Sequence, residues 1–482
     1  MSGPAADDLA GRIAGWLPAA RWFAGKGSGP VQVAIADETT LAEAGVILAL
    51  VDARSDGDAG RYCVPVAVDD GSDAAATAGF CRWLLATVLE GGGVAGRAGR
   101  FAGHCVAGKA TGPGSVDGGE APRLELSPAS LGGLTVEPLG GDASNTSLLV
   151  RTGDAAVAVK LIRRCQAGTQ PEVEVGRFLA AEAGWRETPP LLGWLAYEAA
   201  DGSPPRVLAT VHTYLAGCRT AWEAVGELVA AGGLRGPAGE SLRGCISTIG
   251  RLTGEMHAAL ASRPDLPAFA PAKPRPATCA AEAAGMAAHA RSVLARVAAR
   301  AGSAPPPLAH RLTAVAAAAE RLANGFSAVA EPAAMPAMIR VHGDYHLGQV
   351  LIREADGHVF PIDFEGEPSR PLAERRAKTS PAKDVAGMCR SFDYLLRHAA
   401  RSGGPAYSPE DLATLEGVFL EAYESVAAGQ PWWPADRAVA DRLLAAWKLD
   451  KAIYELGYEL DNRPDWAEVP LAAVEAYLAG AE

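Results

Sequence analysis

A polar loop between two apolar runs carries the residues whose types and order could perform chemistry. The loop spans residues 341–351, where Asp344 follows a His-Gly pair and precedes Gln349. A second carboxylate, Asp363, follows the next apolar run. Phosphoryl transfer needs these groups in this order, because one Asp receives the proton of an attacking hydroxyl while an amide oxygen and a second Asp hold Mg²⁺. Each residue alone is an ordinary turn former, but the ordered set predicts a phosphotransferase.

A hairpin earlier in the chain could hold the phosphates of a nucleotide. Its loop, residues 140–147, consists of small residues, and Lys160 follows on the second strand. Small residues let backbone N–H groups approach a triphosphate, and Ser and Thr hydroxyls can add donors. The same loop also fits plain turn chemistry, so the strand lysine strengthens the nucleotide interpretation. The candidate contacts are Ser144, Asn145, Thr146, Ser147 and Lys160.

Kinases hold the phosphate-binding lysine with a carboxylate on a helix. A helix is predicted over residues 170–179, and Glu174 is our first choice for this carboxylate, with Glu172 as the second. Acids in a first helical turn also complement the helix dipole, and this alternative stays open. The strand that contains His212 and Tyr214 leads into a hinge, whose backbone could hydrogen-bond an adenine edge. We therefore assign both residues to the nucleotide site.

The predicted helix over residues 435–462 could contribute to a sugar site. An apolar stripe should pack on the core, and a separate polar stripe is flanked by aromatic residues. Rings beside charged groups suit the apolar face and the hydroxyls of a sugar, although solvated Lys–Glu pairs fit the spacing equally well. The candidate substrate contacts are Asp344, His346, Glu421, Trp447, Lys451, Tyr454, Glu455, Tyr458 and Glu459.

The elements that must position these residues are mixed helices and strands in the N-terminal part of the chain and helices in the C-terminal part. A helix over residues 7–17, strands at 31–36, 46–52 and 62–68, and a helix over 73–89 predict a compact N-terminal domain without visible chemistry. The Gly-rich stretches 91–103 and 112–119 are interpreted as linkers. Beyond residue 220 the pattern is helical, with His257 expected to be a satisfied, partly buried histidine. A helix that begins at Ser380 and Pro381 is predicted to carry Asp384, Met388, Phe392 and Leu395. The other predicted helices are 246–261, 280–300, 308–322, 409–429 and 435–462.

Composition excludes several classes of protein. At 482 residues, length alone predicts about three domains. A net charge of −12 provides no basic footprint for nucleic acid. Eight scattered cysteines without a Cys-x-x-Cys pair predict neither a zinc site nor a disulfide framework. With no signal-peptide core and no 18-residue apolar run, we expect a cytoplasmic protein without a membrane partner.

The motifs resemble the aminoglycoside-phosphotransferase superfamily, whose fold is similar to that of protein kinases. The superfamily pattern is His342-Gly343-Asp344-x-His346-x-Gly348-Gln349 together with Asp363-Phe364-Glu365. Three further stretches resemble its maltokinase branch, which includes glucosamine kinases: residues 21–26, the run from Asp363 to Tyr394, and the run from Asp450 to Trp466. The resemblance therefore extends over most of the chain.

The resemblance implies an α+β, bilobal, protein-kinase-like fold with ATP between the lobes. The expected parts are an N-terminal cap (1–108), an intermediate subdomain that completes a small mixed-sheet lobe (109–216), and a large helical C-lobe (217–482). It also implies that Asp344 is the catalytic base, that Gln349 and Asp363 bind Mg²⁺, and that Lys160 contacts the α and β phosphates.

The acceptor is expected to be a small-molecule sugar. The phosphate loop departs from the maltokinase pattern, which has an acidic-Gln pair before Ser-Asn-Thr-Ser. An acidic pocket formed by Glu455, Glu459 and Glu421 would suit an ammonium group and, nearly as well, neutral hydroxyls. We therefore favour phosphorylation of glucosamine at its 6-hydroxyl over formation of maltose 1-phosphate. A nucleotide-binding pseudokinase and an aminoglycoside-modifying kinase are the remaining alternatives, and the protein is expected to be a monomer or homodimer.

Overall fold

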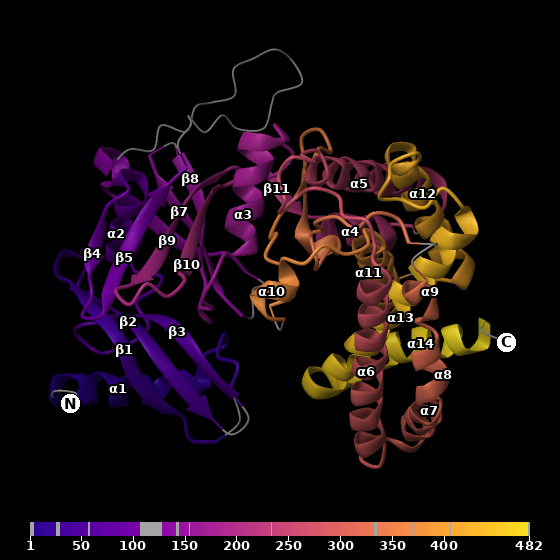
Figure 1. Ribbon diagram of the computed structural model, residues 1–482, viewed down its shortest axis with the longest axis horizontal. Coiled ribbons are helices and arrows are strands. Elements are labelled where there is room, and N and C mark those ends of the chain that lie inside the picture. Colours follow the sequence, from indigo (N-terminus) through magenta and orange to yellow (C-terminus); the bar gives the residue numbers. More distant parts are fainter. Residues whose placement is uncertain are drawn as a thin grey trace. The chain divides into compact units, whose positions relative to one another are not determined.

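The computed structural model places helices and strands in two compact units. Residues 4–25, 29–55, 58–106, 128–140, 144–153, 155–232, 234–331, 335–368, 370–404 and 406–480 are described. Unit 1 comprises Met1–Ala216 and Glu367–Arg375, and unit 2 comprises Gly217–Gly366 and Arg376–Glu482 (Figure 1). Strands predominate in unit 1 and helices in unit 2, which is the segregation expected of an α+β protein.

Unit 1 begins with a helix packed on a small antiparallel sheet. The elements are α1 (Pro4–Trp16), β1 (Gln32–Leu41), β2 (Val46–Ser55) and β3 (Asp58–Ala67), with strand order β1-β2-β3. Leu9 and Ile13, on the predicted apolar face of α1, share a core with Trp22 and Phe23. These elements confirm the predicted helix and strands, whereas Lys26 lies outside the described residues.

A larger sheet forms the rest of unit 1. Its described strands have the order β4-β5-β9-β10-β8-β7-β6, and each neighbouring pair is antiparallel rather than mixed as predicted. The strands are β4 (Gly93–Ala95), β5 (Gly99–Cys105), β6 (Thr135–Pro138), β7 (Thr146–Thr152), β8 (Ala155–Leu161), β9 (Leu191–Ala199) and β10 (Arg206–Thr213). The helix α3 (Pro171–Arg177) follows β8 along the chain.

The prediction of a linker over residues 91–103 was wrong, because β4 and β5 occupy most of it. Glycine is required there by close packing rather than by flexibility. A Cβ on Gly103 would lie 2.0 Å from the backbone oxygen of Thr87 in α2 (Ala78–Glu90). The strand can therefore approach the helix only without a side chain at this position. The second Gly-rich stretch, residues 112–119, lies outside the described residues.

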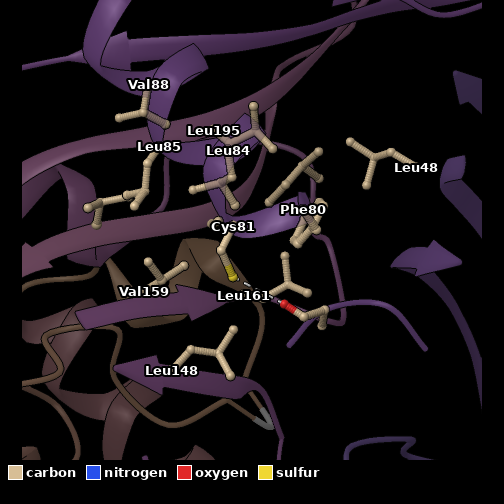
Figure 2. Packing of buried hydrophobic residues seen from close by; sticks show 14 of the residues in the cluster. Leu48, Phe80, Cys81, Leu84, Leu85, Val88, Leu148, Val159, Leu161 and Leu195 are labelled. Atoms are coloured by element: carbon tan, nitrogen blue, oxygen red, sulfur yellow. Dashed lines mark hydrogen bonds between the residues drawn. The ribbon is translucent and has the colours of Figure 1, made fainter. Parts of the chain in front are cut away.

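The helix α2 supplies much of the core of unit 1. Thr77 caps its start by accepting a hydrogen bond from the Phe80 backbone N–H, and Gly91 ends it with a φ of 65°. Figure 2 shows Phe80 and Leu84 of α2 among buried side chains of the sheet, including Val159 and Leu161 of β8. The strand that carries Lys160 thus rests on a continuous apolar core.

Unit 1 contains both the predicted cap (1–108) and the predicted intermediate subdomain (109–216) of the small lobe. One core contains residues from both 1–108 and 109–216, such as Leu48 and Val159, so these two parts are not separate cores. The predicted boundary between the cap and the intermediate subdomain, at residues 108 and 109, lies outside the described residues. The division between residues 216 and 217 coincides with the change of unit, but residues 367–375 return to unit 1.

Unit 2 is mainly helical. Its longer helices confirm the predicted ones, with α7 and α8 replacing the single helix predicted over 308–322. A small sheet of β11 (Cys218–Thr220), β12 (Val350–Arg353) and β13 (Val359–Pro361) accompanies them. The helices are α4 (Ala221–Ala230), α5 (Gly236–Leu260), α6 (Pro276–Ala301), α7 (Pro306–Ala317), α8 (Ala319–Asn324), α9 (Ser327–Ala330), α11 (Ala382–Arg401), α12 (Pro409–Ala427), α13 (Arg437–Asn462) and α14 (Glu468–Gly480), while α10 (Leu372–Arg375) belongs to unit 1.

Within the described residues, every helix is too short or too polar to cross a membrane.

Candidate active site

The loop that contains Asp344 is anchored to the small sheet of unit 2. Strands β12 and β13 form a hairpin, and the Ile362 backbone N–H donates to the Gln349 carbonyl at 2.9 Å. This bond places the chain segments of Gln349 and Asp363 side by side. Gly343, with a φ of 89°, supplies the left-handed conformation immediately before Asp344, which a residue with a side chain rarely adopts.

A buried carboxylate on α11 fixes the backbone of this loop. Asp384 accepts hydrogen bonds from the backbone N–H groups of His342 at 2.7 Å and Gly343 at 2.9 Å. The His257 Nε2–H donates to the same carboxylate at 3.1 Å, and the Tyr423 hydroxyl donates to His257 Nδ1 at 3.0 Å. Burial raises the pKa of Asp384, but His257, His342 and the Gly343 backbone N–H together lower it. The anion is therefore held in place by directed hydrogen bonds.

The side chain of His342 connects the loop to the Asp363 segment. Its Nε2–H donates to the Ile362 carbonyl at 2.7 Å, and its Nδ1 accepts from the Asp344 backbone N–H at 3.4 Å. These partners place a proton on Nε2 of the ring. His342 thereby fixes the positions of two candidate site residues relative to each other.

Asp344 lies beside a lysine of α13. Lys451 Nζ donates to Asp344 Oδ1 at 3.0 Å, and both side chains are about one-fifth exposed. Burial acts to raise the pKa of Asp344, but Lys451, His346 and His342 outweigh it and hold the pKa far below the ordinary value. Burial lowers the pKa of His346, whose Nδ1 accepts from the Gly348 backbone N–H at 3.0 Å. Asp344 is therefore an anion at neutral pH.

Gln349 and Asp363 form the candidate metal site. Gln349 Nε2 donates to Asp363 Oδ2 at 3.1 Å, so an amide and a carboxylate converge at one place. Asp363 has a φ of 66°, which makes it the single non-glycine residue with a left-handed backbone among the described residues. Such conformations cluster at functional sites. Oxygen donors from one or two side chains, completed by substrate phosphates and water, are what Mg²⁺ takes, so these residues fit the ion.

In unit 1, Lys160 pairs with the second-choice carboxylate. Lys160 Nζ lies 3.6 Å from Glu172 Oε2, and His212 Nε2 lies 3.1 Å from Glu172 Oε1. Burial raises the pKa of Glu172, but Lys160 and His212 dominate and lower it to about 2. Glu174, our first choice, is only partly buried on the same helix. Glu172, in the first turn of α3, therefore points toward Lys160 of β8 and His212 of β10.

The described part of the candidate phosphate loop is tied to the sheet. The Arg163 backbone N–H donates to Asn145 Oδ1 at 3.3 Å, and its Nε donates to Thr146 Oγ1 at 2.8 Å. Ser147 stands opposite Lys160 in the β7–β8 pairing. These side chains hold the loop end to the sheet, and the role of binding phosphate stays a prediction for them and for Ser144. Residues 141–143 of the loop lie outside the described residues.

Two carboxylates of α13, Glu455 and Glu459, form ion pairs with arginines. Arg390 donates to Glu455 Oε2 through Nε at 3.0 Å and Nη2 at 2.8 Å. Glu459 accepts two hydrogen bonds from Arg463 and one from the Tyr394 hydroxyl at 3.3 Å. Burial raises the pKa of Glu455, although Arg390 opposes this shift. The predicted acidic pocket is therefore largely neutralised by fixed cations.

Two predicted substrate residues lie away from this group. Glu421 is exposed on α12, whereas Glu416 of the same helix pairs with Lys448 of α13 at 2.6 Å. Residues five positions apart differ by about 140° around a helix, so both cannot face α13. Trp447 is 6% exposed and packs with the core. The aromatic residues on the side of Lys451 are Tyr454, with Lys451 Nζ 5.2 Å from its ring centre, and Tyr458.

Sequence reasoning missed Asp384, His342 and Arg390 as parts of the site. For Asp384 a signal existed, because an acid occupies the same helical stripe as Met388, Phe392 and Leu395. A carboxylate on an apolar stripe requires buried donors, and here they are the backbone N–H groups of the catalytic loop. The prediction that His257 is a satisfied histidine is confirmed, and its partner is this same carboxylate.

Comparisons with known proteins show what this chain is similar to. Residues 16–97 match the maltokinase N-terminal cap domain, and residues 135–366 match the phosphotransferase enzyme family. A glucosamine kinase from Streptacidiphilus jiangxiensis is 33% identical over 343 residues, which cover 68% of this chain and 70% of the relative. A glucosamine kinase from Mycolicibacterium smegmatis is 29% identical over 350 residues, which cover 71% and 79% of the two chains.

A solved structure extends the similarity to nearly the whole chain. Glucosamine kinase in complex with glucosamine, ADP and inorganic phosphate superposes with a TM-score of 0.61 and 25% identity, covering 97% of this chain and 99% of that one. The protein-kinase-like fold and the phosphotransferase class predicted from the motifs are thereby confirmed. This chain belongs to the maltokinase and glucosamine kinase branch of the aminoglycoside-phosphotransferase superfamily.

Proposed function

We propose that this protein transfers the γ-phosphate of ATP to the 6-hydroxyl of glucosamine. The observation that carries the proposal is the 33% identity to a glucosamine kinase over more than two thirds of both chains. The match over nearly the full length to a structure of glucosamine kinase with glucosamine and ADP supports it. The candidate residues supply the groups that such a reaction needs.

Asp344 is assigned as the group that orients the acceptor hydroxyl and takes its proton. Its Oδ1 is bonded to Lys451, while Oδ2 has no hydrogen bond within the described part of the chain. The low pKa of Asp344 makes it a weak base toward a free hydroxyl. In the loose transition state of phosphoryl transfer the proton leaves late, and positioning contributes more than proton abstraction. The network around Asp384 supplies that positioning.

Nucleotide binding is assigned to Lys160 and the adjacent loop of unit 1. Lys160 is held by the buried Glu172, so its ammonium is directed by a fixed anion and can contact the α and β phosphates. Gln349 and Asp363 would hold Mg²⁺, which supplies charge neutralisation for the phosphates when bound. The backbone around His212 and Tyr214 is proposed to contact the adenine edge.

Recognition of the sugar is assigned to the side of α13 that carries Lys451, Tyr454 and Tyr458. Tyr454 and Tyr458 stack with ring centres 6.4 Å apart, and Tyr458 is 43% exposed. Aromatic rings of this kind suit the apolar face of a pyranose. Because Glu455 and Glu459 are held by arginines, an ammonium group would bind next to balanced charges rather than in an unpaired acidic pocket.

Maltokinase activity, which makes maltose 1-phosphate, is the second candidate, because residues 16–97 match the maltokinase cap. A coupled assay of ADP release with glucosamine, glucose, N-acetylglucosamine and maltose separates the two. Glucosamine is expected to give the highest kcat/KM, and Asp344→Asn is expected to lower kcat about 1,000-fold or more while the protein stays folded. A strong maltose signal without turnover of glucosamine would overturn the preferred substrate.

A further inference from the structure

A buried arginine, Arg163, joins the cap (1–108) to the candidate phosphate loop within unit 1. It follows β8, the strand that carries Lys160, and its side chain is 1% exposed. On the loop side, its Nε donates to Thr146 Oγ1 at 2.8 Å, and its backbone N–H donates to Asn145 Oδ1 at 3.3 Å. Arg163 therefore fixes the end of the loop from which β7 begins.

The other contacts of Arg163 come from the cap. Arg163 Nη2 donates to Asp73 Oδ2 at 2.6 Å. The guanidinium lies over the Trp22 ring, with Cζ 4.3 Å from the ring centre. The Cys63 backbone N–H of β3 donates to the Arg163 carbonyl at 2.8 Å. The same residue thus contacts an anion, an aromatic face and a strand of the cap while it holds the loop.

The cap holds its two side-chain contacts in fixed positions. Trp22 is buried and packs on Tyr62 of β3, with ring centres 6.1 Å apart. Asp73 Oδ1 accepts from the Ala75 backbone N–H at 3.0 Å, in the turn before α2. Trp22 also belongs to the stretch 21–26, which resembled the maltokinase branch but has no role in the candidate active site. Its contact with Arg163 connects this stretch to the nucleotide region.

Stability alone does not account for an arginine at this place. Burial lowers the pKa of Arg163 while Asp73 acts to raise it, so the ion pair offsets a cost of desolvation. Arg163 Nη1 is buried without a hydrogen-bond acceptor among the described residues, and the Trp22 ring face compensates a cation only in part. Apolar residues often stabilise a fold as well as a buried ion pair does. A planar fork of donors, in contrast, fixes the direction of its partners.

We propose that Arg163 is a positioning residue through which the cap sets the geometry of the phosphate loop and thereby the affinity for the phosphates of ATP. A loop that is already held in place loses less conformational entropy when a ligand binds, and this raises affinity. Arg163 acts through Asn145 and Thr146, so the effect falls on the phosphates and not on the adenosine. The proposal rests on the proposed nucleotide role of the loop, but it does not depend on the acceptor sugar.

The test uses calorimetric titration of the full chain with a non-hydrolysable ATP analogue and Mg²⁺, and separately with adenosine, which has no phosphates. The deciding variant is Asp73→Asn, which removes the anion on the cap side of Arg163. The Asp73 side chain is 27% exposed, so this change leaves no large cavity. The matched control is Asp52→Asn, because Asp52 forms an ion pair of the same residue types with Arg61 at 2.7 Å within the cap.

A second variant changes the arginine itself. Arg163→Lys keeps the positive charge beside Asp73, but lysine lacks the planar fork that reaches Asp73 and Thr146 together. The double variant Arg163→Lys with Asp73→Asn completes a cycle that measures whether the two residues act along one connection. If Arg163→Lys does not fold, Asp73→Asn and its control decide the question alone.

Asp73→Asn and Arg163→Lys are each expected to weaken binding of the ATP analogue about fivefold or more, as is usual for coupling between two parts of a protein. Adenosine should bind both variants as it binds the wild type, and Asp52→Asn should bind both ligands normally. In the Arg163→Lys background, Asp73→Asn should add less than about twofold, because the connection to Thr146 is already lost.

Equal affinity of the wild type and Asp73→Asn for the ATP analogue would overturn the proposal. So would a loss that adenosine or Asp52→Asn shares equally, because the cap would then act on the whole fold and not on the loop. Failure of the wild type to bind the analogue would overturn the nucleotide assignment and this proposal with it. The titrations contain no acceptor, so a wrong acceptor sugar does not change their outcome.

Discussion

Single residues set the charge state of the proposed base. Asp344 is buried enough for desolvation to favour its neutral form, but Lys451 at 3.0 Å, together with His346 and His342, keeps it ionised. The low pKa of Asp344 therefore depends on a partner more than 100 positions away in the sequence. A motif search finds the Asp but gives no indication of this lysine.

Lys451→Met is expected to raise the pKa of Asp344, because it removes the largest contribution that lowers this pKa. The acidic limb of the pH profile of kcat/KM should then move to higher pH. Lys448→Met is the matched control, since Lys448 lies on the same helix but pairs with Glu416. An unshifted limb in Lys451→Met, or an equal shift in both variants, would contradict the assignment.

Because of Glu172, the free energy of unfolding is expected to depend on pH in the acidic range. Its pKa is about 2 in the folded protein against 4.5 ordinarily, because Lys160 and His212 outweigh burial. A depressed carboxyl pKa stabilises the fold fully above pH 4.5, and this stabilisation is lost as pH falls from 4.5 toward 2.

The measurement compares urea unfolding midpoints of the wild type and Glu172→Gln between pH 6 and pH 3. The advantage of the wild type should be constant near pH 6 and shrink progressively below about pH 4.5. Glu174→Gln serves as the control on the same helix. A difference that stays constant over this range would show that Glu172 does not carry the proposed charge.

Among the elements, α11 connects the helical core to the catalytic loop. Its first turn presents Asp384 to the His342 and Gly343 backbone N–H groups, so the loop conformation is determined by a helix that follows it in sequence. The apolar spacing of α11 was sufficient to predict the helix. The backbone partners of Asp384 could not be predicted, because they depend on how distant segments fold together.

Asp384→Asn is expected to destabilise the protein by about 3 kcal/mol, because one amide oxygen cannot satisfy three buried donors. Chemical denaturation measures this change in the free energy of unfolding. Asp461→Asn is the control, since the ion pair of Asp461 with Arg300 is partly exposed and should contribute less than about 1 kcal/mol. A cost for Asp384→Asn similar to that of the control would contradict the network.

Phe80→Ala is expected to cost about 3 to 5 kcal/mol, because it leaves a cavity between α2 and the sheet. Phe80 is fully buried in the core that joins the cap to the strand of Lys160. Val68→Ala, at a side chain that is 42% exposed, should change stability by less than about 0.5 kcal/mol. If Phe80→Ala unfolded only the cap while the large sheet kept its stability, the shared core would be contradicted.

For the whole molecule, the sequence was sufficient for the class and for most helices. The motif around Asp344 predicted phosphoryl transfer, and the family comparison agrees. Residues 367–375 belong to unit 1, although the chain before and after them belongs to unit 2. This could not be predicted, because the sequence of that short polar segment does not indicate which unit it packs with. The prediction of a linker over the Gly-rich stretch 91–103 was wrong for a related reason. Glycine is required both where a chain is flexible and where two backbones pack closely, so its presence does not distinguish the two.

The partners of the α13 carboxylates mark the other limit of sequence reasoning. Helical spacing placed Glu455 and Glu459 on one stripe, but it could not show that Arg390 and Arg463 would bind them. The acidic pocket was inferred from the carboxylates of two predicted helices, whereas its charge also depends on Arg390 of α11 and on Arg463, which follows α13. Glucosamine as the substrate therefore rests on the relatives more than on this pocket.

The product formed from glucosamine and ATP tests the central claim most directly. We expect ³¹P–¹H correlation spectra to show a phosphate monoester on the C6 oxygen, with Mg²⁺-dependent formation and no product in Asp344→Asn. The same experiment with maltose should give little or no phosphorylated sugar. An anomeric phosphate formed from maltose, with glucosamine left unmodified, would contradict the account.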